Sequence, residues 1–112
     1  MRLRPSLRQN KRYVVFEVQS PSPVSWNELQ PELDRALTLF WGELGRSRAA
    51  PILIKERFNP ANGRFIIKVN HKYVDELKAA LTLSKTIKKT PIILRSIITS
   101  GTLKKAGSLV QT

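Results

Sequence analysis

Apolar and polar residues alternate along four short segments of the chain, and this pattern predicts four β-strands. In residues 12–19 (RYVVFEVQ), Val14, Phe16 and Val18 share one face. Alternation of β-branched and aromatic residues with polar ones is typical of a strand with one buried face. A turn at residues 59–63 (NPANG) contains Asn-Gly, which is a strong hairpin signal. The other predicted strands cover residues 51–58, 64–70 and 90–99.

A period of three to four residues predicts a first helix. Ser25 and Glu28 have the spacing of a capping box. The apolar positions that follow at helical spacing are Leu29, Leu33, Leu37, Phe40 and Leu44, with Ala36 beside them. Pro31 lacks the N–H that would pair with the carbonyl of Asn27. Either a short first turn ends just before Pro31, or the main helix begins with Pro31 in its first turn; the second is favoured. Gly45 is expected to end the helix.

A second helix is predicted over residues 72–85. Its main apolar face carries Val74, Leu77, Ala80 and Leu81. Leu83 lies nearly opposite Val74 at 100° per residue, so this helix has apolar character on a second side. That second side favours either packing under a loop or contact with a partner.

The order of elements is strand, helix, strand, strand, helix, strand. This βαββαβ order predicts an α+β, ferredoxin-like (RNA-recognition-motif-like) sandwich, with a four-stranded antiparallel sheet and the helices on one face. The chain of 112 residues has the length of a single domain. We expect a basic N-terminal arm over 1–11, the ferredoxin-like domain over 12–99, and a basic C-terminal tail or short helix over 100–112.

The sign and the distribution of charge along the chain indicate which class of partner the protein binds. The chain has 20 Lys and Arg against 8 Asp and Glu, a net charge of +12. Residues 1–12 hold five basic residues and no acid, and residues 71–112 hold eight basic and two acidic residues. Such an excess favours a polyanion such as RNA, because Lys and Arg release counterions from phosphates. A basic surface that is merely solvated fits each charge run equally well.

The residues that usually carry protein catalysis or bind metals are scarce. The sequence has no Cys and one His, which excludes disulfides, thiolate ligands and a multi-histidine metal site. His71 has no recognisable partner for acid–base work, so we expect no catalytic residue and no metal site in the chain. No apolar run approaches the roughly 20 residues that span a bilayer. No apolar segment of a signal peptide follows the basic residues 1–11. We therefore expect a cytoplasmic protein that does not associate with a membrane.

The segment from Ser100 to Lys105 is the most suggestive candidate site. A glycine-containing turn before a helix start directs backbone N–H groups outward, and two lysines follow, so a phosphate-binding corner is predicted. The alternative is a capped short terminal helix with solvated lysines. The full set of predicted RNA-binding residues is Arg2, Arg4, Arg8, Lys11, Arg12, Lys85, Lys88, Lys89, Ser100, Gly101, Thr102, Lys104 and Lys105.

The sheet face opposite the predicted helices is partly apolar. RNA recognition motifs stack bases on aromatic residues of the two central strands, and the full aromatic-rich motif is missing here. An apolar open face is either an interaction surface or lies beneath further elements. The predicted partner-binding residues are Tyr13, Val15, Ile66 and Leu83.

Several pieces of the sequence, taken in order, resemble a known family. They are the approach and opening strand Leu7–Val18, the segment LFWGELG at 39–45, GRFIIKV at 63–69, Tyr73-Val74, AALTL at 79–83 and SGTLKK at 100–105. In order and spacing they resemble the ribonuclease P protein component 2 family, the archaeal members of the small ribonuclease P/MRP subunits. The departures lie at 20–23, at 46–57 and after Lys105.

The resemblance implies a non-catalytic protein subunit of ribonuclease P, the endoribonuclease that removes the 5′ leader of precursor tRNA. It implies binding and stabilisation of the catalytic RNA, which holds the catalytic groups and uses magnesium, while the protein itself binds no cofactor. The implied partners are the ribonuclease P RNA, precursor tRNA and protein component 3, in a hetero-oligomer.

Two alternatives stand beside the resemblance. A generic basic RNA-binding module, such as a ribosomal protein, shares the size and charge of the chain. An acylphosphatase-type enzyme shares the fold, but it needs Arg and Asn in the first loop, where this chain has Ser20-Pro21-Ser22-Pro23.

Overall fold

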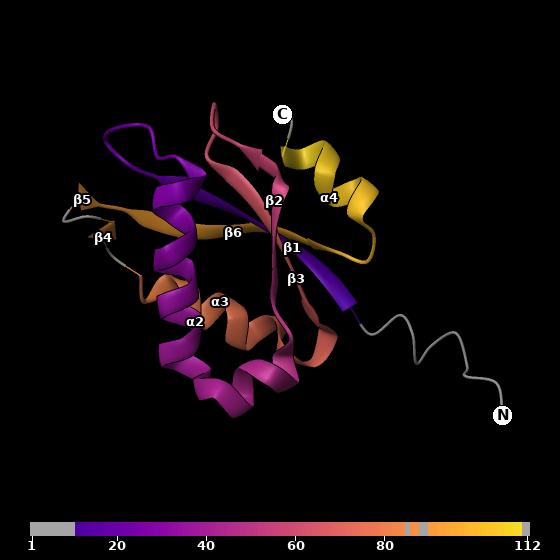
Figure 1. The fold of residues 1–112 in the computed structure, drawn as a ribbon. Helices are drawn as coiled ribbons and strands as arrows, with labels where there is room; N and C mark the ends of the chain where they lie inside the picture. The colour runs from indigo at the N-terminus through magenta and orange to yellow at the C-terminus, as the bar shows by residue number, and fades with distance from the viewer. Residues whose placement is uncertain (1–10, 85, 88–89, 111–112) are drawn as a thin grey trace, which may run out of the picture.

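The computed structural model describes residues 11–84, 86–87 and 90–110. Its elements, in chain order, are β1 (Lys11–Gln19), α2 (Trp26–Ala49), β2 (Ile52–Asn59), β3 (Arg64–Asn70), the 3₁₀ turn η1 (His71–Tyr73), α3 (Val74–Thr82), β4 (Thr86–Ile87), β5 (Thr90–Pro91), β6 (Ile93–Ser100) and α4 (Leu103–Val110). Figure 1 shows them coloured along the chain.

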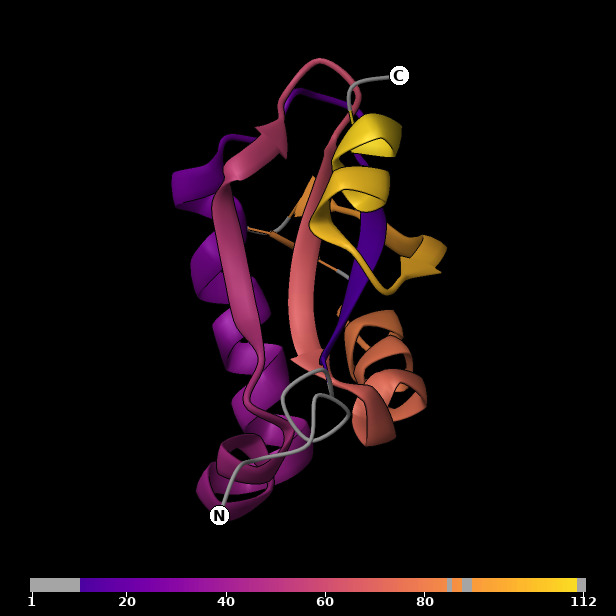
Figure 2. The same cartoon turned by 90° about the vertical axis from the view of Figure 1, so that its right-hand side faces the viewer.

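The main sheet has the strand order β2-β3-β1-β6, and all its neighbours are antiparallel. This is the order that a βαββαβ chain adopts when each crossover passes over the same face, so the predicted ferredoxin-like fold is confirmed. The helices α2 and α3 cover one face. The two predicted helices therefore lie on one face, as predicted, and the C-terminal segment forms a third helix, α4, that packs on the other face. Figures 1 and 2 show α4 in yellow beside the β2–β3 hairpin.

The main core lies between the sheet and the helices α2 and α3. The inward positions of β1 are Val14, Phe16 and Val18, as the alternation predicts. Phe16 stacks on Phe65 of β3 with ring centroids 5.7 Å apart, and Trp26 meets the edge of the same Phe65 ring at 6.3 Å. The first residue of α2 is therefore anchored directly over the centre of the sheet.

The predicted capping box forms, but the favoured start of the helix is wrong. Glu28 N–H donates to Ser25 Oγ at 3.3 Å, and Ser25 N–H donates back to the Glu28 carboxylate at 3.2 Å. The helix α2 therefore begins at Trp26, and Pro31 lies inside it. Pro31 and Asn27 are both exposed, so water can serve the Asn27 carbonyl that Pro31 leaves without a donor.

The helix α2 bends at Gly42 and does not end at Gly45 as predicted. Gly42 has φ 71° and ψ 179°, a conformation open essentially to glycine alone, and the helix then continues to Ala49. Figure 1 shows its last turns running off in a new direction. Across the bend, Arg46 Nη2 pairs with the Asp34 carboxylate at 2.7 Å. Leu44 follows the bend and is left exposed.

Two other boundaries differ from prediction. The helix predicted over 72–85 is divided into η1 and α3, which ends at Thr82. The strand predicted over 90–99 is also divided. Thr90–Pro91 pairs with Thr86–Ile87 in a separate ladder, and the sheet strand β6 begins at Ile93.

Candidate RNA interface

The helix α4 covers the sheet face opposite α2 and α3. Val15 and Ile66 are fully buried against Ala106 and Val110 of α4. The prediction that Val15 and Ile66 contact a partner is corrected to this extent: neither side chain reaches the surface while α4 is in place. The apolar strand positions are explained by the alternative that the face lies beneath a further element. Side chains at the margin of this second core are Tyr13, Ile54, Ile97 and Leu103.

The start of α4 is fixed by its own turn. Ser100 Oγ accepts from the backbone N–H of Thr102 at 3.1 Å, and Thr102 Oγ1 accepts from the N–H of Lys105 at 3.4 Å. The hydroxyl of Ser100 also donates to the Thr102 carbonyl at 3.0 Å. Residues 103–110 thus form a capped short helix, with Gly101, Lys104 and Lys105 exposed at its start.

The end of α4 is held by the β2–β3 hairpin. The side-chain amides of Asn59 and Asn62 donate to the Val110 carbonyl at 3.0 and 2.8 Å. Arg64 Nη1 donates to the Leu109 carbonyl at 2.7 Å. These donors satisfy carbonyls that have no partner within the helix, and the arginine places a positive charge at the negative end of the helix dipole. The position of α4 on the sheet is therefore specified at both of its ends.

Glu17 holds two of the arginines on this side of the sheet. Its carboxylate pairs with Arg64 and with Arg95, each at 3.2 Å, and Gln19 donates a further hydrogen bond at 3.0 Å. Burial raises the pKa of Glu17, but the hydrogen bonds from Gln19, Arg64 and Arg95 outweigh it and hold the pKa below its ordinary value. Arg64 and Arg95 are thereby committed to the fold.

The structure brings part of the predicted RNA-binding set together beside the start of α4. Ser100 pairs with Tyr13 across the sheet, and Tyr13 pairs with Lys68 on the other side. Lys68 Nζ lies 5.9 Å from the centroid of the Tyr13 ring. Lys11 shares this face of β1 with Tyr13 by alternation. Lys68 is not among the residues predicted from the sequence, although its spacing of two from Ile66 assigns it to this face.

The remaining predicted RNA-binding residues fall into two groups. Arg12 begins the core-facing alternation of β1 and donates to the Lys11 carbonyl at 2.9 Å. The others lie outside the residues that the structure describes, and they are Arg2, Arg4, Arg8, Lys85, Lys88 and Lys89.

An exposed apolar patch lies between α2 and α3, on the side of the molecule away from α4. Leu83 is 64% exposed and Leu39 is 78% exposed. With Phe40 they border a cavity of about 300 Å³, whose lining also includes Ser84. The hydroxyl of Ser84 is buried without a hydrogen-bond partner in the described part of the chain. Of the four predicted partner-binding residues, Leu83 is the one that the structure exposes most.

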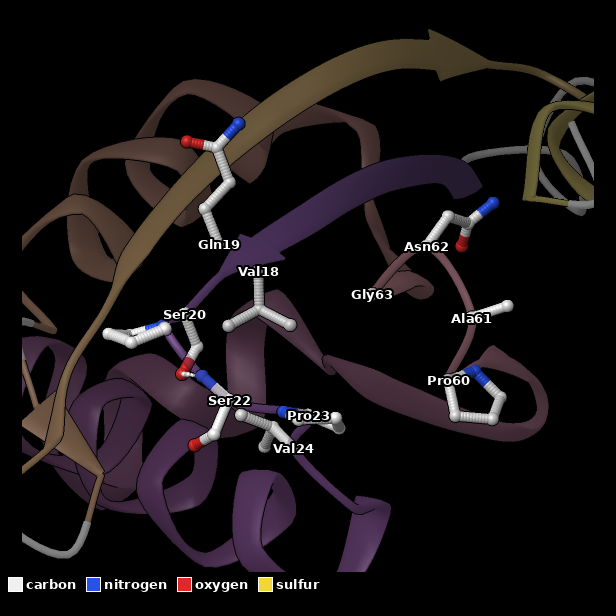
Figure 3. A pocket seen from close by; sticks show the side chains of 11 residues that line it. Val18, Gln19, Ser20, Ser22, Pro23, Val24, Pro60, Ala61, Asn62 and Gly63 are labelled. Carbon is white, nitrogen blue, oxygen red and sulfur yellow. Dashed lines mark hydrogen bonds between the residues drawn. The ribbon is translucent and has the colours of Figure 1, made fainter.

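A second cavity, of about 400 Å³, lies between the link after β1 and the β2–β3 turn (Figure 3). Its lining includes no charged side chain. Asn62 is turned toward α4, and its side-chain carbonyl oxygen accepts from the N–H of Arg64 at 3.0 Å. The first loop therefore lacks the arginine and the asparagine that an acylphosphatase-type phosphate site needs, and Asn62, which comes from the β2–β3 turn, is already bonded.

Neither a metal cluster nor a membrane-spanning helix is found in the described part of the chain. Within residues 11–84, 86–87 and 90–110, no three His, Cys, Asp or Glu side chains gather in a way that suits a metal ion. None of the described helices combines the length and the apolar character needed to cross a membrane.

Comparison with known proteins assigns the family. A model of the Rpp14/Pop5 family matches residues 12–110. The chain is 35% identical to ribonuclease P protein component 2 of Thermococcus kodakarensis, over 92% of this chain and 84% of that protein. It is 32% identical to the Pyrococcus abyssi protein of the same name, over 92% and 86%. The chain belongs to the Rpp14/Pop5 family.

A solved structure supports the fold independently of sequence. A chain in the cryo-EM structure of yeast ribonuclease MRP superposes with a TM-score of 0.64, covering 92% of this chain and 87% of that one, at 12% identity. The family model and the named relatives confirm the predicted family, and with it the role of a protein subunit of ribonuclease P, an endoribonuclease complex. The generic RNA-binding module is not favoured.

The depressed pKa of Glu17 predicts how stability changes with pH. A carboxylate with a lowered folded-state pKa stabilises the protein above its unfolded-state pKa of about 4.3. That contribution is lost as the pH falls from this value through the lower folded-state pKa. We therefore expect Glu17→Gln to be less stable than the wild type at pH 7, and the difference in free energy of unfolding to shrink by pH 3. Urea unfolding at several pH values measures it, and a difference that does not change with pH contradicts this assignment.

Proposed function

We propose that this chain binds the ribonuclease P RNA through the basic surface at the start of α4, and binds a second protein subunit through the apolar patch between α2 and α3. The observation that carries the proposal is the family match over residues 12–110. The net charge of +12 supplies the physical basis for binding RNA.

The RNA-binding surface is defined by Lys11, Lys68, Gly101, Lys104 and Lys105. These residues surround the capped start of α4, and none of the lysines is in an ion pair within the described residues. Lysine side chains of this kind neutralise phosphates and position an RNA without reading its sequence. The surface offers Tyr13 as its aromatic ring, already covered by Lys68, so it favours contact with the backbone of a folded RNA over stacking of bases.

Catalysis in this proposal belongs to the RNA. The protein neutralises phosphate charge, stabilises the active RNA fold and so lowers the magnesium concentration that the reaction needs. The magnesium ions that hydrolyse the bond at the 5′ leader of precursor tRNA are held by RNA groups, and the protein binds no cofactor. We place this activity in the cytoplasm.

The partner-binding surface is defined by Leu39, Phe40 and Leu83. Large apolar side chains at these exposures are costly in water, and a cavity between them offers a place for an inserted side chain. We assign this patch to ribonuclease P protein component 3. The chain would then act in a hetero-oligomer, with its two sheet faces turned to different partners.

Reconstitution tests the proposal directly. The purified chain and protein component 3 are added to ribonuclease P RNA and precursor tRNA at limiting magnesium, and release of the 5′ leader is measured. We expect faster cleavage than with the RNA and component 3 alone, with the difference disappearing at high magnesium. No gain at any magnesium concentration would refute the proposed function.

Changing Lys104 and Lys105 together tests the start of α4. We expect the Lys104→Ala/Lys105→Ala variant to bind the RNA more weakly, and the slope of log affinity against log salt to fall by about one unit for each phosphate that the variant no longer neutralises. The matched control is Lys72→Ala/Lys78→Ala, which removes the same charge from η1 and α3. An unchanged slope, or an equal fall in the control, removes this corner from the RNA-binding surface.

The apolar patch is tested by Leu83→Glu. A carboxylate placed in an apolar contact loses its hydration, so we expect the affinity for component 3 to fall by a factor of about ten or more. Isothermal titration calorimetry measures the affinity. Leu44→Glu is the control, since Leu44 is similarly exposed at 71% but lies beyond the bend in α2. Equal affinity for the wild type and Leu83→Glu would place the partner elsewhere.

A further inference from the structure

The edge strand β2 carries an irregularity that turns a basic side chain toward α4. Ile54 pairs with Ile66 and Asn59 pairs with Arg64, so four residues of β2 stand opposite the single residue between those partners on β3. Such bulges re-aim side chains and are frequent next to functional sites. Phe58 packs into the main core against Trp26, and Arg57 lies on the other side, facing α4.

The guanidinium of Arg57 lies against a glycine of α4. A Cβ atom built on Gly107 would stand 3.0 Å from Arg57 Nη1 and 3.7 Å from Cζ, and among the described residues no other atom outside its own stretch of helix lies within 4 Å. Glycine inside a helix is less favourable than alanine by about 1 kcal/mol. In this short helix the space left by the missing side chain is used by Arg57.

Arg57 and α4 together form the sides of a groove. Its lining residues are Arg57 from β2 and Leu103, Lys104, Gly107 and Ser108 from one side of α4, around a volume of about 570 Å³. No carboxylate is among them. Within the described residues, neither Arg57 nor Lys104 is in an ion pair or donates a side-chain hydrogen bond.

These features point to phosphate as the ligand. An arginine presents a planar fork of N–H groups that matches two phosphate oxygens, and a nearby lysine adds a point charge. The groove has no aromatic side chain on which a base would stack. It therefore suits the sugar–phosphate backbone, and not the bases, of a nucleic acid.

We propose that the groove between β2 and α4 binds the phosphate backbone of an RNA strand, with Arg57 as its main anchor and Gly107 as the residue that positions Arg57. This inference rests on the proposed function and extends its RNA-binding surface from the start of α4 along the β2 side of that helix. Neither Arg57 nor Gly107 belongs to the set predicted from the sequence.

The Gly107→Ala variant tests the position of the Arg57 guanidinium without changing the charge of the protein. The variant keeps every charged group and adds a methyl group where the guanidinium lies. We expect the melting temperature to stay the same or rise, because alanine favours the helix, while the affinity for ribonuclease P RNA falls several-fold. Arg57→Ala is expected to lower the slope of log affinity against log salt by about one unit, and Arg57→Lys to restore the slope but not the full affinity.

The control for net charge is Lys78→Ala, which removes one positive charge from α3, on the opposite side of the sheet from α4. Equal decreases in RNA affinity for Arg57→Ala and Lys78→Ala would overturn the groove assignment, as would full RNA affinity in Gly107→Ala. A fall in affinity for component 3 in Arg57→Ala, with RNA binding intact, would instead assign the groove to a protein and also overturn it.

A tethered cleavage experiment locates the RNA without relying on affinity. The chain has no cysteine, so Ser108→Cys introduces a single thiol at the groove to which iron-EDTA can be attached. In the reconstituted complex we expect hydroxyl-radical cuts in the RNA backbone, confined to one or two short segments. If the complex binds RNA and cleaves precursor tRNA but no cuts appear, the groove assignment is wrong and the proposed function stands. If the wild-type chain neither binds RNA nor stimulates cleavage, the proposed function itself fails.

Discussion

The central strands β1 and β3 carry apolar side chains on both faces, and the rest of the structure depends on covering both. Val14 and Phe16 face α2 and α3, whereas Val15 and Ile66 face the opposite side and are equally buried. A sheet of this kind cannot leave one face in water without exposing large apolar side chains. The helix α4 provides the second cover, although a helix of this length is not stable by itself in water. Its stability comes from burying Ala106 and Val110.

Holding these covering elements in place occupies several arginines, and this determines which positive charges remain available for a partner. The end of α4 is bonded by Arg64, which Glu17 holds together with Arg95. Elsewhere Arg46 spans the bend of α2, and Arg35 pairs with Glu32 at 2.6 Å. Three carboxylates, those of Glu17, Glu32 and Asp34, are thus placed against arginines within the fold. Lysines around the start of α4 have no such partner among the described residues, so their charges remain available to a partner on the face that α4 covers.

The alternation of side chains was enough to predict the sheet, because a residue in a strand has two possible directions and burial selects one. The ends of α2 were not predictable in this way. Whether Pro31 begins a helix or lies inside it depends on access of water to the Asn27 carbonyl, which is a tertiary property. Two glycines lie near the end of this helix, and only the φ angle of Gly42 shows which of them breaks it. For residues 100–112 the sequence does not decide between a tail and a short helix, since a segment of this length favours no single period.

The residues of the candidate site that follow a local sequence signal were predictable from the sequence, and the residue placed by a bulge was not. Lysines at the start of α4 follow a local turn signal, and Lys68 follows from alternation on β3. Arg57 depends on a bulge that changes the direction of its side chain, and no periodic pattern identifies it.

The arrangement as a whole has a functional consequence: α4 and its lysines lie on one side of the sheet, and the apolar patch of α2 and α3 lies on the other. A small chain built in this way can contact RNA and a protein subunit at once, because neither partner needs the surface that the other uses.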